Sequence, residues 1–143
     1  MSLIHLDRPI TDQLLTHLRS TGLLVGDGRK PAGSGWQGTA GQSVFKGYAV
    51  LDNLGGPVDG SLGQPDDTSI VTYQVTSWGR DPAQADIITG LMRTLMSTVN
   101  LAVDGRSVGD PIRVLNGESL VYDVVQPPIY AKYDRYRLWT VPG

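Results

Sequence analysis

Three glycines with the spacing of a dinucleotide-binding loop are the first chemical signal in the chain. Gly33, Gly35 and Gly38, within the stretch AGSGWQGTAGQS (32–43), match the pattern G-x-G-x-x-G. In a dinucleotide fold this loop follows a strand and opens a helix, so that the pyrophosphate meets the helix N-terminus. We predict neither neighbour here, and the Lys-Ser or Lys-Thr pair of a phosphate loop is missing. We therefore interpret residues 26–47 as a glycine-rich loop that binds no cofactor.

Residue types that serve nucleophilic catalysis or metal binding are sparse. The chain has no cysteine, and His5 and His17 are its only histidines. Twelve positions separate them, which is not a familiar spacing of metal ligands. Glu118 is the only glutamate, and no G-x-S-x-G nucleophile elbow is present. We expect no catalytic residue, no metal site and no enzymatic activity.

Tyrosine and arginine alternate near the C-terminus, in the stretch YAKYDRYRLW (130–139). Surfaces that bind single-stranded nucleic acid use this mixture of aromatic and basic side chains. In an extended strand, however, Arg135, Arg137 and Trp139 share one face and Tyr136 the other, so only part of the set can form a stacking platform. The favoured interpretation is a half-buried strand with a basic outer face, which also suits a protein interface. Nucleic-acid binding by this strand remains the alternative function.

Length and composition are those of one ordinary folded domain over residues 1–143. The chain is 40% hydrophobic and 18% charged, with a net charge of -2. A domain of this size buries roughly two-thirds of the surface that its unfolded chain exposes. No basic excess drives the whole molecule toward nucleic acid, and no run of 18 apolar residues predicts a membrane span. We expect a soluble protein that is not secreted.

The N-terminal part of the chain predicts an amphipathic helix. Ile10, Leu14 and Leu18 recur at the spacing i, i+4 and i+8, which gathers them on one helix face. Gly22 suits the left-handed residue that ends a helix, so we expect the helix to stop near Thr21.

A second helix is predicted after residue 80. Asp81 is a natural N-cap, Pro82 suits the first helical position, and Gln84 completes a capping box by reaching back to the cap. Ile87 and its apolar neighbours then broaden the core-facing side of this helix.

The remaining segments predict strands separated by turns. Asn116-Gly117 predicts a hairpin turn, and residues 54–67 predict a second long loop. The order of elements favours an α+β fold, a mostly antiparallel β-sheet with two α-helices packed on one face. The predicted strands are YAVLDN (48–53), TSIVTYQVTSW (68–78), LAVDG (101–105), PIRVLN (111–116), SLVYDVV (119–125) and IYAKYDRYRLWTV (129–141).

In this order of elements the chain resembles the tail terminator, or tail-completion, proteins of long-tailed bacteriophages. Members combine a short helix, a glycine-rich segment, a Y-V-x-L strand, a strand ending in V-x-x-W-x-R and a helix with A-x-x-I. The corresponding features here are 48–51, 75–80 and 85–88. The resemblance covers roughly residues 10–141, and the loops 26–47 and 54–67 depart from it.

The resemblance implies a structural virion protein of the head-tail joining, or neck, region. It implies a ring, a hexamer in this family, that caps the head-proximal end of the tail tube and stops its growth. The implied partners are other copies of the chain, the major tail tube protein and the head-tail connector or stopper protein. DNA passes through such a ring without specific binding. The implied location is the virion, after assembly in the host cytoplasm and without a membrane.

Five residues are candidate contacts in such an assembly. Trp36 lies in the glycine-rich loop with few local neighbours to bury it, so we expect it to contact a partner. Asp66 and Asp67 of one subunit are expected to face Arg135 and Arg137 of its neighbour. Asp59, Asp66 and Asp67 lack the alternation of acidic ligands that an EF-hand loop has, so we expect solvated turns there rather than a calcium site. For Trp78 we expect packing within the chain.

Overall fold

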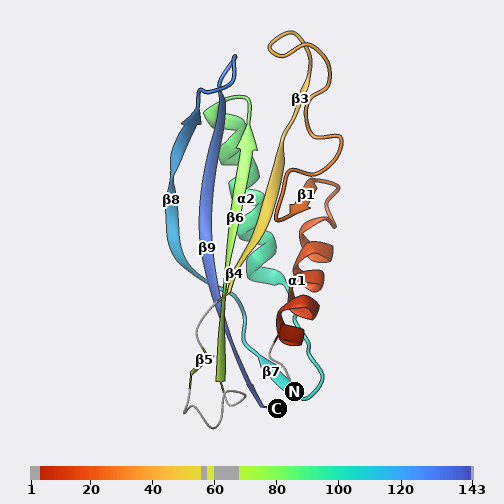
Figure 1. Ribbon diagram of the computed structural model, residues 1–143, viewed down its shortest axis with the longest axis vertical. Coiled ribbons are helices and arrows are strands. Elements are labelled where there is room, and N and C mark those ends of the chain that lie inside the picture. Colours follow the sequence, from red (N-terminus) through yellow and green to blue (C-terminus); the bar gives the residue numbers. More distant parts are fainter. Residues whose placement is uncertain (1–3, 56–57, 60–67, 143) are drawn as a thin grey trace.

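The computed structural model describes residues 4–55, 58–59 and 68–142, and it has the α+β fold predicted from the sequence (Figure 1). The first half contains α1 (Ile4–Leu18), β1 (Leu24–Asp27), β2 (Gly35–Trp36), β3 (Phe45–Lys46), β4 (Tyr48–Gly55) and β5 (Val58–Asp59). The second half contains β6 (Thr68–Gly79), α2 (Pro82–Thr98), β7 (Arg106–Val108), β8 (Ile112–Tyr122) and β9 (Ile129–Pro142).

Seven strands form one sheet, in which β6 and β9 are the long central pair. The order is β1-β4-β6-β9-β7, with β8 also paired to β9 and β5 to β6. All of these pairs are antiparallel except β1 with β4. In the β6–β9 register Tyr73 lies opposite Tyr136 and Val71 opposite Leu138, so all four side chains share one face. The prediction of a mostly antiparallel sheet is confirmed.

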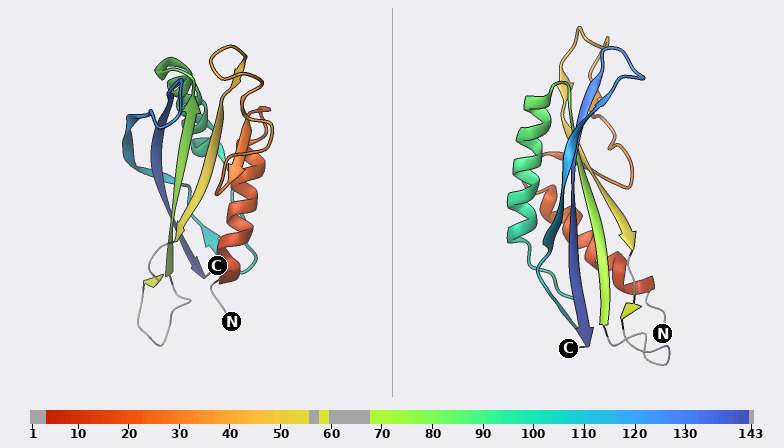
Figure 2. Two further views of the ribbon diagram at one scale, coloured as in Figure 1. Left: turned by 45° about the horizontal axis from the view of Figure 1, so that its top comes forward. Right: turned by 90° about the vertical axis from the view of Figure 1, so that its left-hand side faces the viewer.

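Both helices cover that same face of the sheet, and the core lies beneath them (Figure 2). Ile10, Leu14 and Leu18 of α1 are fully buried, as their helical spacing predicts. The hydroxyls of Thr11 and Tyr73 lie 2.7 Å apart and join α1 to β6 inside this core. The opposite face of the sheet, which we call the outer face, has no helix on it in the described part of the chain.

The second helix begins where the sequence predicts. The Asp81 side chain accepts a hydrogen bond from the Gln84 amide at 2.8 Å, and Pro82 is the first helical residue. The Gln84 side chain accepts from the amide of Arg80 at 2.8 Å, one residue before the predicted target. The placement of Ile87 in the apolar face was wrong, because its side chain is 73% exposed.

The interpretation of residues 26–47 as a loop throughout was wrong in part. β1 extends to Asp27 and pairs parallel with β4, and the two-residue strands β2 and β3 pair with each other. Such short strands leave no alternation of apolar and polar residues in the sequence, so the many glycines indicated a loop over the whole segment. No helix begins at Gly38 in the described structure, so the helix that a dinucleotide fingerprint requires does not follow the glycines.

The predicted hairpin at Asn116-Gly117 does not form, because β8 runs through both residues. The register between β8 and β9 shifts there, as a β-bulge does. Gly117 is buried against β9, and a Cβ on it would lie 2.1 Å from the carbonyl oxygen of Tyr133. The glycine therefore permits a close approach of two strands, and the chain turns later, between β8 and β9. The predicted strand at 101–105 is also absent, except for a single bridge between Val103 and Arg106.

Candidate interaction surface

The strand β8 forms an edge of the sheet and exposes nearly all of its side chains. It pairs with β9 on one side, and no described strand pairs with its other side. Of its eleven residues only Gly117 is buried. Ile112 and Leu120 lie opposite Arg137 and Ala131 on the outer face, while Val121 lies opposite Tyr130. Apolar side chains therefore project from both faces of this edge.

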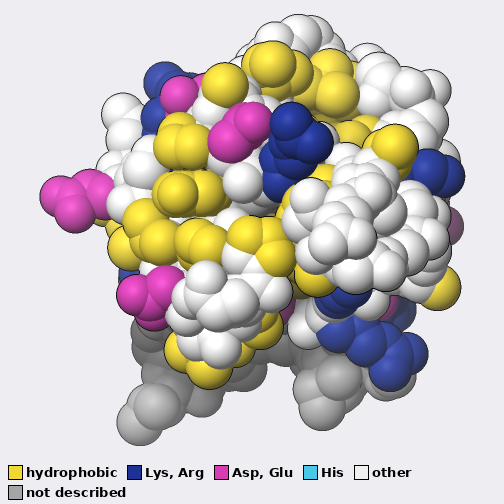
Figure 3. Space-filling model, turned by 90° about the horizontal axis from the view of Figure 1, so that it is seen from above, with side chains coloured by type: hydrophobic (Ala, Val, Ile, Leu, Met, Phe, Trp, Pro, Cys, Tyr) yellow, Lys and Arg dark blue, Asp and Glu magenta, His cyan; other side chains and the backbone are white. Residues whose placement is uncertain are grey.

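The exposed apolar side chains of β8 and of the turn that follows it make up what we call the β8 patch. Exposed fractions reach 57% at Val121 on the strand and 80% at Val124 in the turn that follows. In the view from above, hydrophobic side chains gather on the side where β8 lies (Figure 3). Sheet edges of monomeric proteins are usually guarded by charge, proline or a cover, and large apolar patches mark interaction sites. The β8 patch consists of Ile112, Val114, Leu115, Leu120, Val121, Tyr122, Val124 and Val125.

The opposite edge of the sheet, at β1, is guarded by polar side chains. Arg8 of α1 binds Asp27 at 2.9 Å and Asp12 at 2.7 Å. The Arg19 guanidinium donates a hydrogen bond to the carbonyl oxygen of Val25 at 3.0 Å, which occupies an acceptor of the edge strand. Among the described residues the two edges thus differ in chemistry, with polar side chains along β1 and exposed apolar side chains along β8.

Beyond β1, residues 28–47 carry positive charge and no acidic residue, and we call them the basic segment. Its cations, Arg29, Lys30 and Lys46, are all exposed. Lys30 lies over the ring of Tyr48, with its Nζ 5.8 Å from the ring centroid. Val44, two positions before Lys46, is 69% exposed.

Trp36 belongs to a row of aromatic rings on the outer face, so the premise that it has few local neighbours was wrong. Its ring meets Phe45 edge to face, with centroids 5.1 Å apart. The row continues through Tyr48 to Trp78, and Trp78 meets Tyr122 of β8 at 6.1 Å. Packing of Trp78 within the chain is therefore observed, against two tyrosines. Trp36 remains half-buried, and its contact with a partner stays a prediction.

Arg135 and Arg137 lie side by side on the outer face of β9, as the alternation predicts. Both are exposed, whereas Tyr136 between them is buried. Arg135 donates a hydrogen bond to the side-chain oxygen of Gln74 at 3.0 Å and lies over the ring of Tyr133. Trp36 is on the same face of the sheet but packs with the aromatic row rather than with these arginines. Asp66 and Asp67 lie outside the described residues, so their pairing with the arginines stays a prediction.

The charges on the helix-covered face are paired inside the chain. Arg93 of α2 makes two hydrogen bonds to the buried carboxylate of Asp134, at 2.8 and 2.9 Å. Beside this pair, burial raises the pKa of the Tyr136 phenol to about 12, and the negative charge of Asp134 adds to the rise. Lys132 binds Asp86 at 3.3 Å. This polar row joins α2 to β9 and serves the fold.

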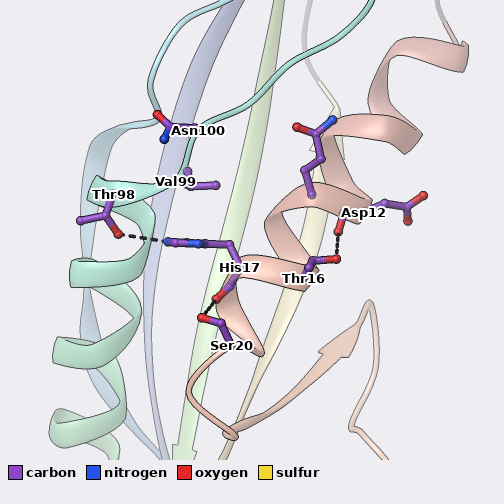
Figure 4. A pocket seen from close by; sticks show the side chains of 8 residues that line it. Asp12, Thr16, His17, Ser20, Thr98, Val99 and Asn100 are labelled. Atoms are coloured by element: carbon purple, nitrogen blue, oxygen red, sulfur yellow. Dashed lines mark hydrogen bonds between the residues drawn. The ribbon is translucent and has the colours of Figure 1, made fainter.

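A groove of about 500 Å³ lies between the two helices (Figure 4). His17 points across it from α1, and its Nε2 lies 3.0 Å from the hydroxyl of Thr98 at the end of α2. The Ser20 hydroxyl donates to the carbonyl of His17 instead of contacting the imidazole. Among the described residues no carboxylate binds the His17 ring, so the third member of a catalytic triad is missing here. The His17–Thr98 contact joins the helices.

The glycine-rich loop presents carbonyl oxygens to its own interior. The Gln37 side chain donates hydrogen bonds to the carbonyls of Gly33 and Gly35 at 2.9 and 3.0 Å. A phosphate cradle requires the opposite polarity, with amide hydrogens directed inward. Over the residues described, no group of three acidic, histidine or cysteine side chains could hold a metal ion. Within the same residues, no helix has the length and apolarity to cross a bilayer.

No protein-family model matches the chain, and no curated protein matches it. Sequence reasoning missed the β8 patch, which contains eight of the exposed large apolar side chains. One signal was present in SLVYDVV (119–125), where three apolar residues follow one another and two more come after Asp123. A strand with one solvated face alternates instead. The run lies within one predicted strand, but the sequence does not indicate that this strand forms an edge of the sheet.

Proposed function

We propose that this chain is a structural subunit that assembles into a ring, of the tail terminator type found in the neck of long-tailed bacteriophages. The observation that carries the proposal is the β8 patch, an apolar sheet edge left uncovered by the rest of the described chain. An edge of this kind gains both backbone hydrogen bonds and apolar burial when another chain covers it.

The distribution of charge and polarity supports self-assembly of the head-to-tail kind. A closed ring uses heterologous contacts, in which one patch of each subunit meets a different patch of the next. The sheet has two unlike edges, one apolar and one polar, as such contacts require. A ring subunit needs complementary surfaces rather than an enclosed pocket, and the groove between the helices is an open one.

The resemblance of the sequence to the terminator family supplies the proposed biological role. The ring, a hexamer in this proposal, caps the head-proximal end of the tail tube and stops its growth. It contacts the major tail tube protein on one side and the head-tail connector or stopper protein on the other. DNA passes through the ring without specific binding, in the virion and after assembly in the host cytoplasm.

The test is the solution mass of the purified chain by light scattering over a wide concentration range, with electron microscopy of any oligomer. The proposal predicts a discrete closed ring whose population rises with concentration. A chain that remains monomeric at every concentration, including in the presence of capped and uncapped tail tubes, would refute it.

The alternative is binding of single-stranded nucleic acid through the outer face of β9. It is favoured by one observation, the adjacent exposure of Arg135, Arg137 and Trp139 on that strand. Phosphate contacts release counterions, so such binding would weaken steeply as salt rises. Titration of a labelled single-stranded oligonucleotide at two salt concentrations distinguishes this function from ring assembly. The matched control is Arg135→Gln with Arg137→Gln, which should abolish the salt-dependent binding.

A further inference from the structure

We infer that the β8 patch of one copy docks onto the basic segment of the next copy. The inference rests on the proposed ring and names the two surfaces that form its subunit contact. The occupant of the β8 patch is thus a second copy of this chain, joined through residues 28–47.

Charge complementarity supports this pairing. Residues 110–125, which contain the β8 patch, carry Asp110, Glu118 and Asp123 against the single cation Arg113. The basic segment carries three cations and no acid. All of these charged side chains are exposed, and among the described residues none of them forms an ion pair. Each surface therefore has an excess of charge that the other can neutralise.

The positions of the two surfaces make the contact intermolecular. β8 pairs with β9 at one end of the strand order, whereas the basic segment follows β1 at the other end and contains β2 and β3, which form a separate two-stranded sheet (Figure 1). Within one chain the two surfaces approach each other at the turn after β8, where a Cβ on Gly41 would lie 3.3 Å from Pro127. The free edge of β8 faces away from β9, with β9, β6 and β4 between it and β1, so the basic segment of the same chain does not cover that edge. When β8 of one copy meets the basic segment of the next, the first copy still has a free basic segment and the second still has a free β8 patch. Such contacts continue until a ring closes.

A back-to-back contact between two β8 patches is disfavoured by the same charges. Two copies would bring Glu118 and Asp123 of both chains into one interface, where like charges oppose association. The basic segment also offers apolar surface, since Val44 is 69% exposed and the Trp36 ring is half-buried beside it. Apolar side chains of β8 can cover both residues.

Two reversed-charge variants test the pairing. The first changes β8 by Glu118→Lys with Leu120→Lys, and the second changes the basic segment by Val44→Asp with Lys46→Glu. All four side chains are exposed, so both variants should keep the wild-type unfolding transition. Each variant alone should associate about tenfold or more weakly than the wild type, because like charges then meet at every contact.

A one-to-one mixture of the two variants should recover the wild-type oligomer mass. In an alternating ring, every contact of the mixture joins opposite charges again. The matched control is Ile87→Lys, an equally exposed apolar residue on α2 that lies in neither surface, and it should leave the oligomer unchanged. Light scattering of the three variants, the mixture and the wild type provides the readout.

The outcomes separate this inference from the proposed function. If both variants still form the wild-type ring, the two surfaces do not dock as inferred, although the ring stands. The same holds if each variant fails to associate and the mixture does not recover the oligomer. A wild type that stays monomeric overturns the ring and this contact together.

Discussion

The helix-covered face of the sheet and its β8 edge contain similar residue types, but these residues are buried on the face and exposed at the edge. On the covered face, leucine, valine and tyrosine side chains are buried under α1 and α2, and the carboxylate of Asp134 is paired with Arg93. At the edge, leucine, valine and tyrosine side chains are exposed, and Glu118 has no ion pair among the described residues. The first region is buried and paired within one chain, whereas the second leaves apolar side chains and a carboxylate exposed.

This contrast means that stability and assembly depend on different residues. Apolar burial that is complete in the monomer contributes to folding, and apolar surface that is left exposed contributes only when a partner covers it. Matched substitutions in the two regions should therefore separate the two properties.

The largest expected difference is between two leucines. Leu14→Ala removes a fully buried side chain and should lower the free energy of unfolding by about 2–5 kcal/mol. Leu120→Ala removes a side chain that is 51% exposed and should change the stability of the monomer by less than about 0.5 kcal/mol. Urea denaturation at a dilution that keeps the chain monomeric measures both. Equal losses would contradict the distinction between core and edge.

Two carboxylates give the next comparison. Asp134→Asn leaves Arg93 without its buried partner and should cost about 2–3 kcal/mol, with the partial exposure of Arg93 moderating the loss. Glu118→Gln alters an exposed side chain and should cost less than about 0.5 kcal/mol, while weakening association. Denaturation and light scattering of the two variants test both statements. A stability loss at Glu118 that matched the loss at Asp134 would show that the edge belongs to the folding core.

The buried tyrosine predicts a loss of stability in alkali. Since the pKa of Tyr136 is raised to about 12 in the folded chain, the unfolded chain loses this proton first, near pH 10. The contribution to stability is complete below pH 10 and falls between pH 10 and 12, by roughly 3 kcal/mol in all. Burial raises the pKa of Tyr48 in the same direction, so the measurement is the difference between the wild type and Tyr136→Phe. If the free energy of unfolding fell equally with pH in the wild type and in Tyr136→Phe, Tyr136 would not be the cause of the loss.

The last comparison concerns two glycines. Gly117→Ala places a methyl group against the Tyr133 carbonyl and should cost about 1–3 kcal/mol, because β8 must move away from β9. Gly90 is exposed within α2, and a Cβ there meets nothing within 4 Å, so Gly90→Ala should gain roughly 0.5–1 kcal/mol. Thermal unfolding of the pair shows whether β8 is held against β9 as closely as described. A neutral Gly117→Ala variant would argue against that contact.

Local sequence signals were sufficient for much of this fold. The spacing of Ile10, Leu14 and Leu18 predicted α1, the Asp81 cap predicted the start of α2, and strict alternation predicted β6 and the two faces of β9. These signals work because each element has one buried side and one solvated side.

The missed features all depend on contacts between distant segments. β1 is only four residues long and is held by parallel pairing with β4, which no local pattern records. Asn116-Gly117 has the composition of a hairpin turn, yet the glycine is required by the Tyr133 backbone in another strand. Which strand forms the edge is a property of the whole sheet, so the β8 patch could be recognised only once β8 was placed beside β9.

Amide hydrogen exchange of the wild-type chain, compared at a dilute and a concentrated condition, tests the central claim most directly. An edge strand exchanges readily when its backbone is open to solvent and slowly when another chain covers it. The account predicts that protection rises on concentration in residues 112–125 and 28–47, while the peptides of α1 and α2 are unchanged. Added protection confined to the helices, or none in β8 while the oligomer forms, would contradict it.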